Sequence, residues 1–190
     1  MSRSVTIIAE IKTKSPFGYA SEKKWEDIFV LAEKVGDIIS IHTDPRWGGS
    51  FDLIRTARAL TKKPILAKGI HAEDGYIKMA LEAGADFVLV VGRIPPAGVI
   101  DLSRCLLEPA SFEQMKIWAA DPALIAAKIV WNSRDLATGG PKEESFKDAR
   151  AIFPGWLCQA SNIRTIADID PTADAVLVGT HLADFSVSVI

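Results

Sequence analysis

Two charged side chains of opposite sign stand two positions apart in the segment AEIKTKSP, at the end of the first apolar run of the chain. They are Glu10 and Lys12, and Ser15-Pro16 interrupts the run directly afterwards. Because residues i and i+2 of a strand point to the same side, both charges project from one face of the strand's end. A carboxylate and an ammonium group crowded into a partly dehydrated pocket shift each other's pKa, which suits general acid–base chemistry.

Polar side chains also end several later apolar runs. They are Lys68 in ILAKG, Glu108 in LLEP, Asn132 and Arg134 in VWNSRD, Ser161 and Asn162 in QASN, and Gly179 and Thr180 in LVGT. Any single charge among them is explained equally well by an ion pair that fills a core. Two carboxylates and two ammonium groups at strand ends favour a catalytic pocket instead.

The runs that carry these residues have the pattern of parallel strands. They are nearly continuous apolar strings, as expected for strands buried on both faces. The eight runs span residues 4–11, 37–42, 64–70, 85–92, 104–109, 127–132, 156–161 and 173–179. Helical segments are expected between them, at residues 24–35, 50–61, 72–84, 111–122, 143–154 and 165–171.

This alternation predicts a closed (β/α)₈ barrel of the TIM type, with an open doubly wound sheet as the rival. Such barrels typically need about 250 residues, whereas this chain has 190. We therefore expect one compact barrel domain over residues 1–190 with shortened or missing outer helices. The link at 94–103 has room for about one helical turn, and the tail at 181–190 is expected to be too short for a full closing helix.

A barrel places its working face at the carboxyl ends of the strands, so all these polar residues should meet at its mouth. The seventh and eighth runs end in small or hydroxylic residues before helical segments, where barrels often hold phosphate. Each of these motifs alone is equally typical of a helix N-cap. Their position on adjacent late strands favours an anion site.

The composition argues against several classes of protein. A net charge of −2 leaves no basic surplus for nucleic acid, and no apolar run approaches the roughly 20 residues of a membrane helix. We expect a cytoplasmic protein in which Cys105 and Cys158 are reduced, packed thiols and no metal is bound. We interpret His42, at the end of the second run, as a structural histidine with satisfied hydrogen bonds.

The segments IIAEIKTKSP, ISIHTDPRWGGS, PILAKGI, EAGADFVLVV, VWNSRDL and AVLVGTHL, in this order, resemble the indole-3-glycerol-phosphate synthase family. The resemblance implies a (β/α)₈ barrel without cofactor or metal. It also implies ring closure, decarboxylation and dehydration of 1-(2-carboxyphenylamino)-1-deoxyribulose 5-phosphate in tryptophan biosynthesis.

The resemblance further implies a role for each strand-end residue. Lys68 would be the general acid, Glu108 its acid–base partner, and Glu10 the residue that assists proton transfer and positions Lys68. Lys12 would hold the carboxylate that leaves as carbon dioxide. The remaining roles would be orientation of the sugar hydroxyls by Asn132 and Arg134, and contacts to the phosphate and its approach by Ser15, Ser161, Asn162, Gly179 and Thr180.

Some positions depart from the family pattern. The chain starts four residues before the first strand, without the family's N-terminal extension, so we expect a more open mouth. Phe17 stands in the first loop, and Asn162 replaces a glycine, which is expected to crowd the phosphate. Trp47 has two interpretations, a stacking partner for an aromatic ring in the pocket or a cover for the barrel rim.

These departures leave two alternatives open. The barrel could act on a different phosphosugar or an aromatic acid, because barrels change substrate through their loops. Alternatively, the chain could be a non-catalytic binding subunit, with barrel surface left uncovered by missing helices serving as a contact to a partner or a second copy.

Overall fold

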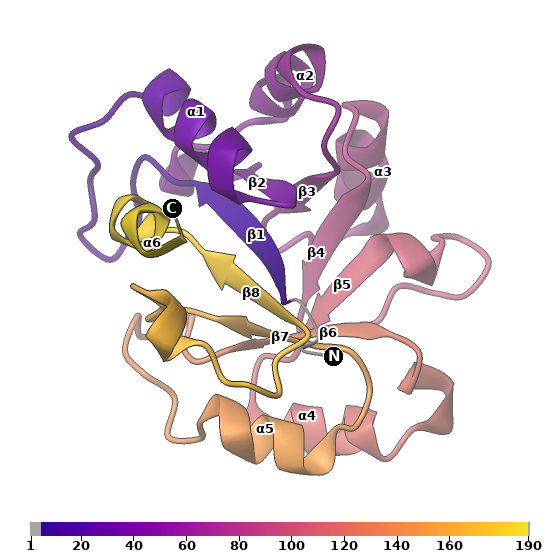
Figure 1. Cartoon of the computed structure of the whole chain (residues 1–190). Helices are drawn as coiled ribbons and strands as arrows, with labels where there is room; N and C mark the ends of the chain where they lie inside the picture. Colours follow the sequence, from indigo (N-terminus) through magenta and orange to yellow (C-terminus); the bar gives the residue numbers. More distant parts are fainter. Residues whose placement is uncertain (1–4, 190) are drawn as a thin grey trace.

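The computed structural model describes residues 5–189 and contains eight strands. The strands are β1 (Thr6–Ile11), β2 (Ile38–His42), β3 (Ile65–Lys68), β4 (Phe87–Val91), β5 (Cys105–Glu108), β6 (Lys128–Asn132), β7 (Leu157–Ala160) and β8 (Ala175–Val178). Each strand pairs in parallel with the next, and β8 pairs with β1, so the sheet closes into a barrel (Figure 1). The sequence prediction of a (β/α)₈ barrel is therefore confirmed.

The helices surround this sheet. They are α1 (Trp25–Val35), α2 (Phe51–Leu60), α3 (Asp74–Glu82), α4 (Phe112–Ala119), α5 (Phe146–Ile152) and α6 (Leu182–Val189), with short 3₁₀ turns η1 (Pro45–Trp47), η2 (Leu102–Arg104), η3 (Pro122–Leu124) and η4 (Ile166–Asp168). In Figure 1, α1, α2 and α3 lie around the first four strands, and α4 and α5 lie on the opposite side. Only η2 separates β4 from β5, and only η4 separates β7 from β8, so two outer helices are reduced to single turns.

The chain's tail differs from the expectation. Residues 182–189 form α6, a helix as long as α4, whereas the sequence pattern suggested that the tail was too short for a full closing helix. Leu182 and Phe185 are buried on α6, which packs beside α1 and η4. Burial of two large apolar side chains, worth about 1.5–3 kcal/mol each, stabilises a helix too short to be stable alone.

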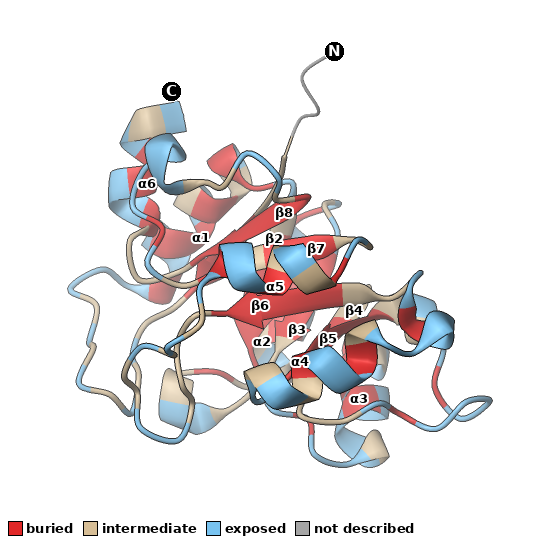
Figure 2. Ribbon diagram, turned by 90° about the horizontal axis from the view of Figure 1, so that it is seen from below, coloured by how far each residue is buried: buried red, intermediate tan, exposed pale blue. Residues whose placement is uncertain are grey.

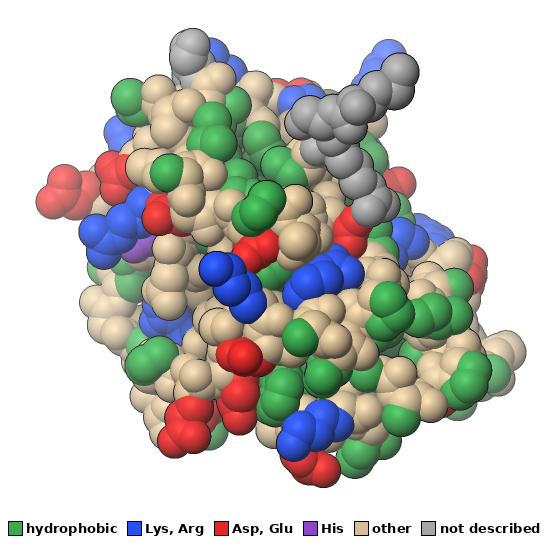
Figure 3. Space-filling view, turned by 60° about the horizontal axis from the view of Figure 1, so that its bottom comes forward, with side chains coloured by type: hydrophobic (Ala, Val, Ile, Leu, Met, Phe, Trp, Pro, Cys, Tyr) green, Lys and Arg blue, Asp and Glu red, His purple; other side chains and the backbone are tan. Residues whose placement is uncertain are grey.

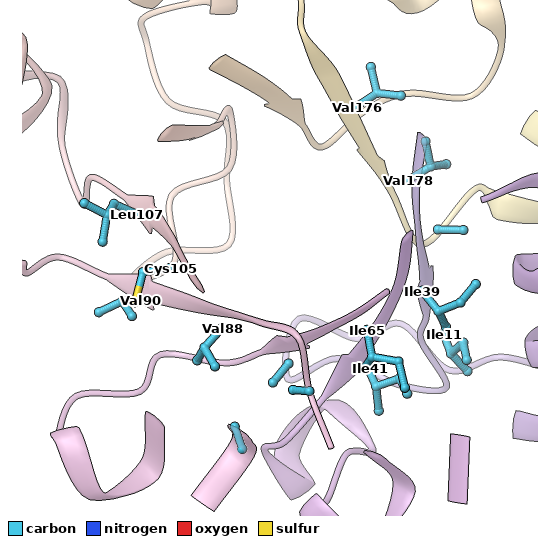
Figure 4. Close-up of a cluster of buried hydrophobic side chains, with 14 of the residues drawn as sticks. Ile11, Ile39, Ile41, Ile65, Val88, Val90, Cys105, Leu107, Val176 and Val178 are labelled. Atoms are coloured by element: carbon cyan, nitrogen blue, oxygen red, sulfur yellow. The ribbon is translucent and has the colours of Figure 1, made fainter. Parts of the chain in front are cut away.

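Two apolar layers hold the barrel together. Inside it, alternate strand residues form a core of Ile8, Leu66, Leu89, Leu106, Val130, Cys158, Ala160, Ala175 and Leu177. Outside it, the opposite faces of the strands pack against the helices. Figure 4 draws strand residues of this outer layer, among them Ile39, Val88 and Val178. Figure 2 shows the same division, with buried strands and helices that are exposed on their outer faces.

The inner layer decides which residues reach the mouth. Side chains alternate between the two faces of a strand, so the residue two positions after an interior one points inward again, nearer the carboxyl end. Glu10 follows Ile8 in this way, and Lys68 follows Leu66. The same alternation turns the ends of β5, β6 and β8 toward the mouth.

Two loops at the mouth fold into small hairpins. In the loop after β1, Lys14 and Ala20 form an antiparallel bridge, and in the loop after β6, Arg134 and Pro141 do the same. The tips of the hairpins touch, because a Cβ added to Gly139 would lie 2.4 Å from the Phe17 ring. Gly139 has a φ of 76°, a left-handed conformation that glycine adopts without strain.

Candidate active site

An ion pair between β1 and β3 lies at the centre of the mouth. Lys68 Nζ is 3.1 Å from Glu10 Oε1. The carboxylate is almost completely buried, whereas 17% of the lysine side chain is exposed. A buried carboxylate requires such a partner, and the partly exposed ammonium group can still reach a molecule in the mouth.

A second group of hydrogen bonds joins β5, β6 and β7. The Asn132 amide donates from Nδ2 to Glu108 Oε1 at 2.9 Å. Its Oδ1 accepts from the Ser161 hydroxyl at 2.6 Å and from the backbone N–H of Arg134 at 3.1 Å. These bonds fix the orientation of the amide, so Asn132 holds Glu108 in place.

The two carboxylates have opposite pKa shifts. Burial acts to raise the pKa of Glu10, but the charges of Lys68 and Lys12 and the hydrogen bond from Lys68 outweigh it and lower this pKa from 4.5 to about 2. Burial raises the pKa of Glu108, and Lys68 and the Asn132 hydrogen bond offset this only in part. Glu10 is therefore a permanent anion, whereas Glu108 keeps a proton more readily, which separates a charge-stabilising role from an acid role.

The seam between β1 and β8 carries further groups. Lys12 Nζ donates to the Thr180 hydroxyl at 3.2 Å. Burial lowers the pKa of Lys12, while the charge of Glu10 opposes this shift. A Cβ added to Gly179 would lie 2.1 Å from Glu10 Oε2, so the carboxylate packs directly against the glycine backbone.

The mouth contains two adjoining clefts. The first is mainly polar and is lined from β1 and the ends of β6, β7 and β8, including Lys12, Arg134, Asn162 and Thr180. The second is more apolar and includes Ile70, Leu89, Val91 and Glu108 in its lining. Trp47, Lys68, Asn132 and Leu136 line both. A ligand with a polar end and an apolar end would therefore have its middle next to Lys68.

Aromatic side chains form one wall of these clefts. Trp47 stacks flat on His42, with ring centroids 5.0 Å apart and an interplanar angle of 2°. Phe17 meets Trp47 edge to face at 6.3 Å and lines the polar cleft. Trp47 thus both covers the rim and faces the cleft, so the two interpretations of this residue describe one position.

Two predicted site residues differ in their relation to the clefts. The Ser15 hydroxyl accepts the N–H of Phe17 within its own hairpin, and Ser15 is outside the lining of both clefts. Asn162 lines the polar cleft, is exposed and takes a φ of 60°, so the backbone turns here without a glycine. Asparagine tolerates this left-handed conformation better than most residues.

Sequence reasoning missed two groups at the mouth. Leu136 lines both clefts from the hairpin after β6, and nothing in its type distinguishes an apolar loop residue as functional. The interpretation of His42 as a satisfied structural residue was wrong: within residues 5–189, its buried Nδ1 has no hydrogen-bond partner. The rule that selected Glu10 and Lys68, a polar residue at a strand end, would have found it.

Both cysteines lie in the interior. Cys105 and Cys158 are buried free thiols, and burial raises the pKa of each. Within residues 5–189, no cluster of His, Cys, Asp and Glu offers three metal ligands, and no helix combines the length and hydropathy needed to span a membrane. On the face in Figure 3, basic and acidic side chains are interspersed with small hydrophobic groups.

Comparison with known proteins supports the resemblance seen in the sequence. A family model described as indole-3-glycerol phosphate synthase matches residues 1–100. The enzyme of that name from Leptospira interrogans serogroup Icterohaemorrhagiae serovar copenhageni (strain Fiocruz L1-130) is 27% identical over 202 residues, which cover 96% of this chain and 79% of the relative. The one from Aquifex aeolicus (strain VF5) is 36% identical over 141 residues, 70% of this chain and 55% of the relative.

A solved structure shares the fold. The structure titled "Crystal Structure of 3-Hexulose-6-Phosphate Synthase" superposes with a TM-score of 0.64 and covers 98% of this chain and 100% of its own. Its sequence identity is 17%, so this likeness supports the barrel fold alone.

Proposed function

Because the chain belongs to the indole-3-glycerol phosphate synthase family, we propose that it closes the indole ring of 1-(2-carboxyphenylamino)-1-deoxyribulose 5-phosphate. The product would be indole glycerol phosphate, with release of carbon dioxide and water. The observation that carries this proposal is the Glu10–Lys68 ion pair beside the Glu108–Asn132 hydrogen bond, where the two clefts join.

Lys68 is proposed as the general acid for ring closure. The ring carbon that bears the carboxylate attacks the sugar carbonyl, and the carbonyl oxygen accepts a proton from the Lys68 ammonium. Loss of carbon dioxide then restores the aromatic ring. An ammonium group next to a developing alkoxide supplies both charge stabilisation and a proton.

Glu108 is proposed to act in the dehydration. Its raised pKa favours the protonated form, which can give a proton to the leaving hydroxyl. The same carboxylate can then accept a proton from the intermediate as the double bond forms. Asn132 would hold this carboxyl group in place through the 2.9 Å hydrogen bond.

The polar cleft suits the phosphosugar end. Arg134 and Lys12 line it, together with the loop ends after β7 and β8 at Ser161, Gly179 and Thr180. Lys12 bonds to Thr180 at this end, so a cation and a hydroxyl stand together where the phosphate or the leaving carboxylate would bind. The apolar lining of the second cleft suits the aromatic ring.

Turnover by the purified protein tests the proposal. The wild type should convert the substrate to a product with indole fluorescence, and Lys68→Ala should lower kcat by at least a thousandfold. Lys24→Ala, which changes an exposed lysine at the start of α1, is the matched control and should leave kcat unchanged. An inert wild type, or equal rates for wild type and Lys68→Ala, would contradict the assignment.

A thermal-shift screen of phosphosugars and aromatic acids separates the alternatives. Stabilisation by the synthase substrate supports the proposal. Stabilisation by another phosphosugar alone would indicate a different substrate on the same strand ends.

A further inference from the structure

His42 lies between the ion pair and the aromatic wall. It is the last residue of β2, its exposed fraction is 6%, and one face of its ring stacks on Trp47. The Nε2 atom is 3.9 Å from Glu10 Oε1, the same oxygen that binds Lys68. Histidine and lysine therefore approach one carboxylate oxygen, with only the lysine within hydrogen-bonding distance.

The surroundings determine which ring nitrogen carries the hydrogen. Nδ1 is buried and finds no partner among residues 5–189, and a buried N–H without an acceptor is costlier and rarer than an unused lone pair. The single hydrogen of the neutral ring is thus expected on Nε2, where it faces the carboxylate of Glu10.

The ring is neutral in the free protein. Burial and the nearby charge of Lys68 lower the pKa of His42 from 6.5 to about 3. Lys12 lowers this pKa further, while Glu10 and Asp44 oppose the shift. His42 can therefore donate one hydrogen bond but does not add a second positive charge at neutral pH.

Glu10 needs a second donor whenever Lys68 moves. Protonation of a substrate oxygen requires the Lys68 ammonium to turn away from the carboxylate, and an unpaired buried carboxylate is strongly unfavourable. Glu10 cannot turn toward the β8 side, because its Oε2 already packs against Gly179. The Nε2 of His42 is the nearby donor on the remaining side.

We propose that His42 is a positioning residue that donates from Nε2 to Glu10 when Lys68 leaves, so that the lysine is released to the substrate. The identity of that substrate rests on the proposed function, whereas the exchange of donors at Glu10 does not.

Two variants separate the hydrogen bond from the stacking. His42→Phe keeps an aromatic face for Trp47 but removes the N–H, and His42→Gln places an amide N–H near the position of Nε2. Acetylation of Lys68 by acetic anhydride, followed by mass spectrometry, reports how readily this lysine leaves Glu10. Lys24 in the same digest is the exposed reference.

Relative to Lys24, we expect Lys68 to react about tenfold more slowly in His42→Phe and within about twofold of wild type in His42→Gln. Equal labelling of Lys68 in wild type and both variants would overturn the proposal. Slow labelling in both variants would also overturn it, because loss of the ring rather than of the N–H would then be responsible.

NMR of ¹⁵N-labelled histidine gives a readout that needs no substrate. The His42 ring should be the neutral Nε2–H tautomer from pH 5 to pH 8. A hydrogen on Nδ1, or protonation near pH 6.5, would contradict the donor role.

Turnover then distinguishes this inference from the proposed function. In an active wild type, His42→Phe should lower kcat about tenfold with KM within about twofold, and His42→Gln should recover most of the loss. An inert wild type would refute the synthase activity, while the labelling and NMR results would still decide the role of His42.

Discussion

Gly179 shows how an absent side chain shapes the mouth. The backbone of Gly179 packs against Glu10, and a Cβ added to the glycine would lie 2.1 Å from Glu10 Oε2. We predict that Gly179→Ala displaces the carboxylate, loosens the 3.1 Å contact with Lys68 and lowers kcat tenfold or more. The free energy of unfolding should fall by about 1–3 kcal/mol, as is typical of overpacking. Steady-state kinetics and urea unfolding measure the two effects.

Gly75→Ala is the matched control. Gly75 lies in α3, where an added Cβ would meet nothing within 4 Å. The Gly75→Ala substitution should leave kcat unchanged and stabilise the protein by about 0.5–1 kcal/mol, because alanine has a higher helix propensity than glycine. If Gly179→Ala kept wild-type kcat, the close packing of Glu10 would have no bearing on its function.

The sequence identifies many residues of the mouth because strand alternation follows directly from residue spacing. Glu10, Lys68 and Glu108 all appear at strand ends by this rule. The opposite pKa shifts of the two carboxylates could not be predicted, because they depend on distances across the barrel. The unpaired Nδ1 of His42 is likewise a property of the packed interior.

The hairpins after β1 and β6 contact each other at their tips, so a change in one tip should displace the other. Gly139→Ala would add a methyl group 2.4 Å from the Phe17 ring and would force that ring away from the cleft. We predict a rise in KM of about fivefold or more with little change in kcat, since Phe17 lines the polar cleft and is not a member of the ion pair. The left-handed φ of 76° should add a loss of stability of about 1–2 kcal/mol.

Gly98 offers a control with the same strain. Its φ is 79°, and an added Cβ would meet no atom within 4 Å. Gly98→Ala should therefore show a similar drop in melting temperature and an unchanged KM. A matching rise in KM in both variants would show that the contact with Phe17 is irrelevant to binding.

Elements were predictable to different degrees. All eight strands lie within their predicted runs, because strands buried on both faces leave a continuous apolar pattern. The segment at 165–171 forms only the single turn η4 instead of a helix. In contrast, α6 is longer than expected because it packs on α1. A local sequence pattern contains no information about such a tertiary contact.

The pH dependence of the whole protein's stability should reflect the two carboxylates with opposite signs. Glu10 has a folded pKa of about 2, below its ordinary 4.5, so it contributes stability that is full above pH 4.5 and is lost as pH falls toward 2. Glu10→Gln should lower the free energy of unfolding by roughly 3 kcal/mol at pH 7 and by roughly 1 kcal/mol at pH 3. Urea unfolding across this range measures both values.

Glu108→Gln should act in the opposite direction. The folded pKa of Glu108 lies above its ordinary value, so its favourable contribution is present below pH 4.5 and is lost as pH rises through the folded pKa. Replacing it with a neutral amide should stabilise the protein by about 1 kcal/mol at pH 7 while lowering kcat strongly. Destabilisation at pH 7 would mean that Glu108 is a firmly paired anion.

The seam between β1 and β8 also bears on how the protein acquires its function as it folds. Neighbouring strands elsewhere in the barrel are close in sequence, but the bond from Lys12 to Thr180 joins residues 168 positions apart. Long-range pairings carry the largest loop-closure entropy, so they form late. Glu10 meets Gly179 across this same seam. A newly made chain would therefore hold most of its secondary structure before it had a competent site, and the site would be completed together with closure of the barrel.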